Sequence, residues 1–180
     1  MSNEQKAVEQ WLDDVVIGLN LCPFAAKPRR NNQIRFVTSE AVTSEALLTD
    51  LYDELKLLEN TPADDVETTL LILPKVLANF DDYNQFLDIV DELLFSFQWE
   101  GVFQVASFHP DYCFAETEPD SVENLTNRSP YPILHIIREA SMEQALKHLT
   151  APDEVFKRNI KTMDNLSEKE VKRLFPYLHK

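Results

Sequence analysis

Residue types that can do chemistry gather in one long connection between two apolar runs. Residues 107–139, SFHPDYCFAETEPDSVENLTNRSPYPILHIIRE, leave one predicted strand and return through another. Loops of this length inside a compact domain are uncommon, and they are usually either functional or disordered. Prolines within the segment restrict its backbone. We therefore predict that it forms the wall of a small-ligand site.

His109 is the first candidate for proton transfer, because histidine has an unperturbed pKa near neutrality. Asp111, two residues further on, is placed to orient an imidazole. The alternative role for His109 is to brace the loop. Cys22 is a third catalytic candidate, since nearby arginines would lower the pKa of its thiol. It follows a helix rather than opening one, however, so a buried apolar role is the alternative.

Basic side chains supply the predicted substrate contacts. The segment Leu21–Ser39 has four basic residues and no acidic one, in a chain whose net charge is -14. Guanidinium groups match carboxylate and phosphate oxygens, so this segment and Arg128 predict a site for a small anionic ligand. The alternative is that these arginines pair with acidic residues elsewhere. For His135, between two isoleucines, the alternative is a core histidine. The predicted substrate-binding residues are Arg29, Arg30, Arg35, Asn127, Arg128, Tyr131, His135 and Arg138.

Composition limits the class of protein. At 180 residues we expect one domain, residues 1–180. The acidic balance argues against binding to nucleic acid or anionic lipid. No apolar run reaches the ~18 residues of a membrane span. Two glycines exclude a Gly-rich phosphate loop, and two cysteines favour a reducing, cytoplasmic setting. The histidines and cysteines match no zinc spacing, so we expect no metal and no cofactor. The oligomeric state stays open.

Hydrophobic periodicity predicts helices alternating with strands. Capping-box spacing marks the starts Ser2, Ser141 and Ser167, and Pro152 suits the first turn of another helix. This order favours an α/β (mixed α+β) fold, with about four strands in a mixed sheet flanked by helices and extra helices at the C-terminus. A ferredoxin-like arrangement and a short three-layer sandwich both fit. The predicted helices are 2–19, 43–58, 79–98 and 152–163, with others near 141 and 167, and the predicted strands are 33–38, 68–73, 102–108 and 132–138.

Three motifs together resemble a known family. GLNLCPFA near the start, FHPDYCF and NRSPYPILHIIRE resemble a bacterial family, the domain of unknown function numbered 1415. The resemblance covers almost the whole chain and implies a stand-alone cytoplasmic bacterial protein. It implies no activity.

Three functions fit these residues. The first is an enzyme, a hydrolase or group transferase acting on a small anionic metabolite, with His109 as the proton-transfer group and the arginines as clamp. The second is a module that binds a ligand or a protein without catalysis. The third is a subunit of a larger assembly built through the C-terminal helices. The first two require the loop and the early arginines to meet at one rim of the sheet.

Overall fold

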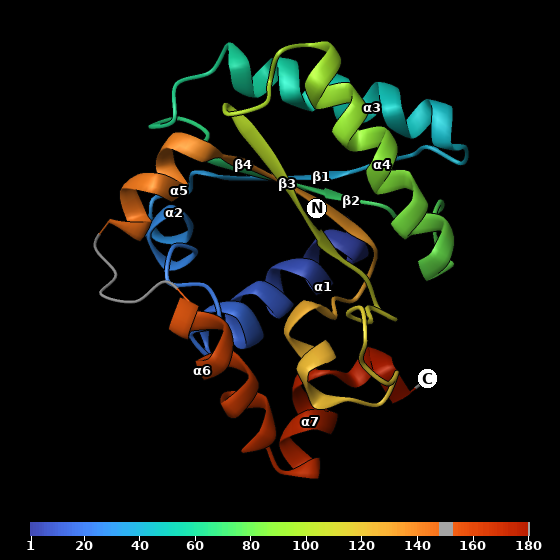
Figure 1. Ribbon diagram of the computed structural model, residues 1–180, viewed down its shortest axis with the longest axis vertical. Coiled ribbons are helices and arrows are strands. Elements are labelled where there is room, and N and C mark those ends of the chain that lie inside the picture. Colours follow the sequence, from blue (N-terminus) through green and yellow to red (C-terminus); the bar gives the residue numbers. More distant parts are fainter. Residues whose placement is uncertain (148–152, 180) are drawn as a thin grey trace.

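A computed structural model describes residues 1–147 and 153–179 of the chain (Figure 1). Four strands form one mixed sheet in the order β1-β2-β4-β3. The elements are α1 (Asn3–Trp11), the π-helix η1 (Leu12–Ile17), α2 (Ala26–Arg30), β1 (Ile34–Thr38), α3 (Ser44–Glu59), β2 (Thr68–Ile72), α4 (Phe80–Ser96), β3 (Phe103–Phe108), the 3-10 helix η2 (Val122–Asn127), β4 (Ile133–Arg138), α5 (Glu139–Leu146), α6 (Asp153–Asp164), α7 (Glu168–Leu174) and the 3-10 helix η3 (Pro176–His179).

The predicted four-stranded mixed sheet is confirmed. β1 and β2 are parallel, and β4 runs antiparallel to both β2 and β3. β1, β2 and β3 therefore point the same way, and their carboxyl ends share one edge of the sheet. The order β-α-β-α-β-β differs from the β-α-β-β-α-β order of a ferredoxin-like fold.

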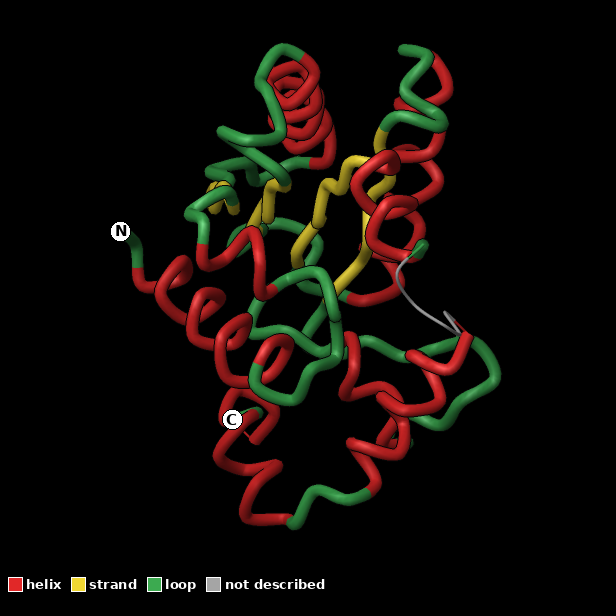
Figure 2. The backbone as a smooth tube through the Cα atoms, turned by 90° about the vertical axis from the view of Figure 1, so that its left-hand side faces the viewer, coloured by secondary structure: helices red, strands yellow, loops and turns green. Residues whose placement is uncertain are grey.

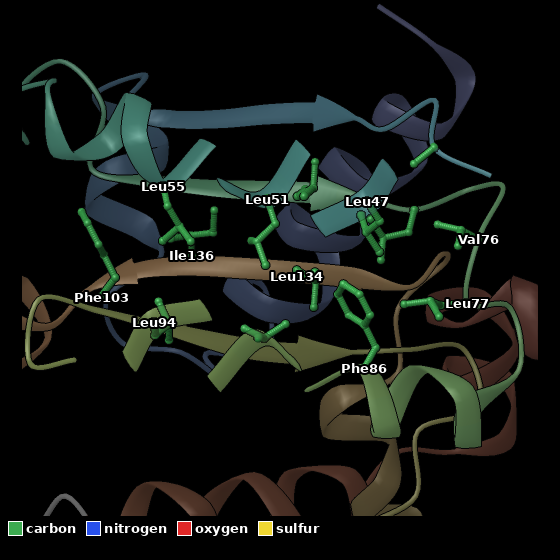
Figure 3. Packing of buried hydrophobic residues seen from close by; sticks show 14 of the residues in the cluster. Leu47, Leu51, Leu55, Val76, Leu77, Phe86, Leu94, Phe103, Leu134 and Ile136 are labelled. Atoms are coloured by element: carbon green, nitrogen blue, oxygen red, sulfur yellow. The ribbon is translucent and has the colours of Figure 1, made fainter. Parts of the chain in front are cut away.

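Helices cover both faces of the sheet, which gives three layers (Figures 1 and 2). α3 and α4 pack on one face through leucines such as Leu47, Leu51 and Leu55 (Figure 3). α1, η1 and the C-terminal helices pack on the other face. The apolar run of β2 serves both layers, because Leu71 belongs to the α3/α4 side and Leu70 to the α1 side.

Side-chain caps start α1, α4 and α7, at Ser2, Asn79 and Ser167. The hydroxyl of Ser2 accepts from the backbone of Gln5, and Asn79 accepts from two backbone N–H groups of α4. Ser167 forms the complete capping box. Ser141 is not a cap, because α5 continues directly from β4 and begins at Glu139. Pro152 lies outside the described residues.

Candidate functional site

His109 follows β3 at the edge where the parallel strands end, and its side chain is fully buried. The backbone N–H of Asp111 donates to Nδ1 over 3.0 Å, so Nδ1 carries the lone pair. Nε2 therefore carries the proton and donates to the carbonyl oxygen of Leu77 over 3.1 Å. The rings of Phe80 and Tyr83 enclose the imidazole. Burial lowers the pKa of His109, and both ring nitrogens are engaged within the protein.

Side chains of the long connection hold its own backbone. Arg128 donates through Nε to the carbonyl of Tyr112 and through Nη2 to that of Pro119. The side-chain amide of Asn127 donates to the backbone carbonyl of Ser107, and the backbone carbonyl of Asn127 accepts the backbone N–H of His109. The long connection after β3 is therefore an ordered loop, held together by hydrogen bonds from its side chains to its own backbone. The carboxylate of Asp111 is exposed, pointing to no partner among the described residues.

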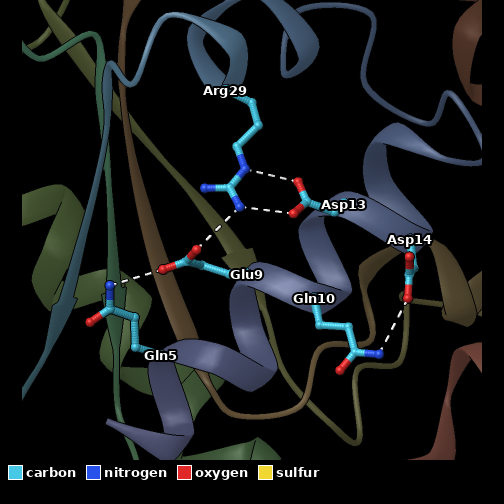
Figure 4. Close-up of polar contacts among 6 residues, drawn as sticks. All are labelled: Gln5, Glu9, Gln10, Asp13, Asp14 and Arg29. Carbon is cyan, nitrogen blue, oxygen red and sulfur yellow. Dashed lines mark hydrogen bonds and ion pairs between the residues drawn. The ribbon is translucent and has the colours of Figure 1, made fainter. Parts of the chain in front are cut away.

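The arginines of the early segment point to different parts of the molecule. Arg29 donates Nε and Nη2 to the carboxylate of Asp13 and Nη2 also to Glu9 (Figure 4). These contacts, with Asp13 first, raise the pKa of Arg29. Arg35 forms a two-bond pair with Glu54 on α3, which covers the opposite face of the sheet. Arg29 and Arg35 therefore pair with acidic residues elsewhere in the chain, which is the alternative considered from the sequence.

Arg30 is exposed, and no hydrogen bond joins its side chain to another described residue. Arg138 lies at the end of β4, where it is paired in register with Phe103 at the start of β3. Its guanidinium donates to three carbonyl oxygens, those of Leu58, Thr61 and Val66. Arg138 is therefore at the sheet edge opposite His109.

The structure thus does not bring the predicted site residues together at one rim. The guanidinium groups of Arg29, Arg35, Arg128 and Arg138 each have internal partners in separate places. Cys22 is half-buried, and burial raises the pKa of its thiol, which disfavours the thiolate. Tyr131 packs in the apolar layer beneath the sheet.

His135 keeps one ring nitrogen without a hydrogen-bond partner among the described residues. The hydroxyl of Thr68 donates its single hydrogen to the carbonyl of Ile136 over 2.5 Å. The same oxygen lies 2.7 Å from Nε2 of His135, so it accepts the Nε2 proton. The lone pair is then on Nδ1, and no described residue donates to it. His135 is partly exposed on the α1-facing side of β4.

Burial lowers the pKa of His135 to about 4, so the ring is neutral at pH 7. Its neighbour Phe108 lies with ring centroids 6.2 Å apart. The ring of Trp11 also lies near Phe108, with ring centroids 5.2 Å apart, and its buried indole N–H has no hydrogen-bond partner among the described residues. One acceptor and one donor without partners among the described residues therefore belong to neighbours of the same phenyl ring.

Two cavities lie elsewhere. One of about 490 Å³ lies at the carboxyl end of β1, and it is lined by acidic side chains that include Asp50, Asp53 and Glu54. The other, of about 450 Å³, lies between the long connection and α6 and is lined by Phe114, Glu116, Glu123 and Phe156 among others. Neither is lined by a basic residue. No cluster suited to a metal ion occurs within residues 1–147 and 153–179.

Sequence reasoning missed Thr68 and Trp11. The alternation in β2 places Thr68 on the same face as Leu70, but its contact with His135 requires the pairing register of β2 with β4. The orphan indole of Trp11 has no sequence signal, because its residue type also suits the apolar stripe of a helix.

Comparisons with known proteins place the chain in a family. No curated protein matches it, and no solved structure matches it. Among the described residues, no helix combines the length and the apolar character needed to cross a membrane. Residues 3–173 match a family model whose description is "Protein of unknown function (DUF1415)". The chain belongs to this family, as the three sequence motifs indicate.

Proposed function

We propose that the protein is a non-catalytic binding module for a small ligand, which it takes up on the α1-facing side of the sheet beside His135. The observation that carries this proposal is the open Nδ1 lone pair of a neutral imidazole whose other nitrogen is bonded to Thr68. A fixed acceptor of this kind selects a ligand group that offers an N–H or O–H.

The surroundings favour a planar, largely apolar ligand. The partly exposed rings of Phe36 and Phe108 lie on the same face of the sheet as His135. The small side chain of Ala106 is paired in register with His135 on the neighbouring strand. The indole N–H of Trp11 supplies an unpartnered donor nearby. Small-molecule sites combine such apolar walls with a few polar groups.

The low pKa of His135 favours binding over acid–base catalysis. An efficient general base has a pKa near the working pH, whereas the pKa of His135 is about 4. The sequence prediction of an enzyme that uses His109 on a small anionic metabolite has less support, because both nitrogens of His109 are engaged and Arg128 binds its own loop. Both cysteines are free thiols, so our proposal keeps a cytoplasmic setting.

The test is NMR of the ¹⁵N-labelled imidazole rings during titration with small fragments, namely indole, phenol and 2-aminopyridine. We expect Nδ1 of His135 to be unprotonated at pH 7 and its resonance to shift saturably with at least one fragment. Fragment binding should be lost in His135→Phe, and the shift of the His135 resonance should weaken in Trp11→Phe. The proposal would be disproved if no fragment shifts the His135 resonance. It would also be disproved if the fragments bind only in the cavity beside Asp50.

A further inference from the structure

The negative charge of this chain is concentrated in one segment. Residues 40–100, which include α3 and α4, hold 15 of the 31 acidic residues but only two of the 17 basic ones. The remainder of the chain is therefore close to neutral, and nearly all of the net charge of -14 belongs to residues 40–100, most of it on α3 and α4. A field of one sign on one face steers partners of the opposite sign.

Large apolar side chains are exposed in and just after this acidic segment. Phe95 is 69% exposed in the last turn of α4, and Phe97 and Val102 are each 46% exposed in the turn that follows. Ile89, on the same helix, is 40% exposed. Clustered exposed apolar side chains mark interaction surfaces more often than single ones do. We define the acidic aromatic surface as Asp88, Ile89, Asp91, Glu92, Phe95, Phe97, Glu100 and Val102.

One aromatic ring of this surface, that of Phe97, is held in place before any partner arrives. Phe97 stacks on Trp99 with ring centroids 5.2 Å apart, and it contacts Tyr52 of α3 at 4.9 Å. The indole N–H of Trp99 donates to Glu59. A rigid, half-exposed ring loses little conformational entropy on binding, which suits an anchor at a protein interface.

The carboxyl end of α4 lacks any positive charge of its own. No basic residue lies in its last turn, where the helix dipole is negative, and Asp91, Glu92 and Glu100 are exposed around it. A second copy of this chain would bring carboxylates against carboxylates, which disfavours self-association there. Anionic lipid and nucleic acid are repelled for the same reason.

We propose that the acidic aromatic surface docks a basic amphipathic segment of another protein, with Phe95, Phe97 and Val102 contacting its apolar side chains and the surrounding carboxylates contacting its lysines or arginines. This proposal concerns the opposite side of the sheet from His135 and does not depend on the binding of a small ligand there.

The probe is a fluorescein-labelled helical peptide of leucine and lysine in which the leucines form one stripe along the helix. The control is a labelled peptide of the same composition in scrambled order. Fluorescence anisotropy measures the Kd at two salt concentrations. We expect the striped peptide to bind more tightly than the scrambled one, with an affinity that falls as salt rises. Phe95→Ser should raise the Kd about tenfold. Asp91→Asn combined with Glu92→Gln should reduce the salt dependence.

Phe156→Ser is the matched control, since Phe156 is 51% exposed on α6, on the other side of the sheet. It should leave the Kd unchanged. Val102→Ser provides a second variant of the surface in case Phe95→Ser is poorly folded by circular dichroism. Equal binding of the two peptides, or equal losses in the Phe95 and Phe156 variants, would overturn the proposal. Sedimentation that shows a dimer dispersed by Phe95→Ser would overturn it too.

Discussion

The hydroxyl oxygen of Thr68 lies 2.7 Å from Nε2 of His135 and fixes which ring nitrogen carries the proton. Because that hydroxyl donates to the carbonyl of Ile136, it can only accept from the imidazole. A single threonine on the neighbouring strand therefore decides that the free nitrogen of His135 is an acceptor.

Replacing Thr68 should release this tautomer and destabilise the sheet. Thr68→Val removes a buried hydroxyl with two hydrogen bonds, so we expect the free energy of unfolding to fall by about 1–3 kcal/mol. Thr68→Ser keeps the hydroxyl and should cost less. Urea unfolding measures the stability and ¹⁵N shifts of the His135 ring report the tautomer. Unchanged ring shifts in Thr68→Val would contradict the assignment.

His135 should make stability depend on pH in a defined window. The ordinary histidine pKa is 6.5, and burial lowers that of folded His135 to about 4. Between these values the unfolded chain binds more protons than the folded one, so the free energy of unfolding falls as pH drops from about 6.5 to about 4. The loss is at most about 3 kcal/mol, and partial exposure of the ring reduces it.

Urea unfolding of the wild type and of His135→Phe across that range isolates this contribution, because the buried His109 and the carboxylates affect both proteins alike. As pH falls from about 6.5 to about 4, the wild type should lose more free energy of unfolding than His135→Phe does. Parallel stability curves would show that His135 is hydrated enough to keep an ordinary pKa.

His109 should prove to be a structural residue. His109→Ala removes a fully buried ring that joins β3 to the segment before α4 through Leu77, and it leaves a cavity against Phe80 and Tyr83. We expect a loss of about 3 kcal/mol or more in thermal or urea unfolding. Asp111→Ala, whose exposed side chain is replaced, should change stability little. A His109→Ala protein of native stability would return His109 to the candidates for a functional role.

Arg138 should behave as a clamp on the end of α3. Arg138→Met keeps the aliphatic stem but loses hydrogen bonds to the carbonyls of Leu58, Thr61 and Val66. We expect a loss of about 2 kcal/mol or more in urea unfolding, with faster amide exchange near Thr61. Arg30→Met, at an exposed arginine, is the control and should be nearly neutral. Equal effects of the two substitutions would contradict the clamp.

Gly18 should be intolerant of any side chain, although its backbone angles are helical. A Cβ atom there would meet the carbonyl group of Asp14, with the carbonyl carbon at 2.9 Å, because the π-helix η1 brings that group close. Gly18→Ala should therefore lower the free energy of unfolding by about 1–3 kcal/mol. A glycine-to-alanine change at an unstrained position would raise it instead. Gly101→Asn is the comparison, since Gly101 has open space and a φ of +76° that asparagine tolerates. A gain of stability in Gly18→Ala would refute this.

Most elements of the fold were predictable because they have a local signal. Leu47, Leu51 and Leu55 repeat at helical spacing and form the buried face of α3. Asn79 caps α4 as its residue type suggests. The short helix α2 was not predicted, since five residues with Pro28 among them have no periodicity to read. Likewise, nothing local distinguishes η1 from an ordinary continuation of α1.

The site could not be predicted from residue types, because most of the polar partners are backbone carbonyls far away in sequence. Arg138 meets the carbonyls of Leu58 and Val66, and His109 meets that of Leu77. A carbonyl group is present at every position and leaves no trace in the sequence. Pairing of the early arginines with acidic residues was one of the two alternatives considered from the sequence. Which acid Arg29 would meet could not be predicted, because its contact with Asp13 depends on where α2 folds back.

The last strand in the chain is an interior strand of the sheet. β4 separates β2 from β3, so β3 has no strand partner until residues 133–138 have emerged from the ribosome. A nascent chain that ends before this point carries a β1-β2 pair with an open edge and an unpaired β3. Ribosome-bound chains shorter than this should therefore be open to proteases and to mispairing, and completion of the sheet must await the final third of translation.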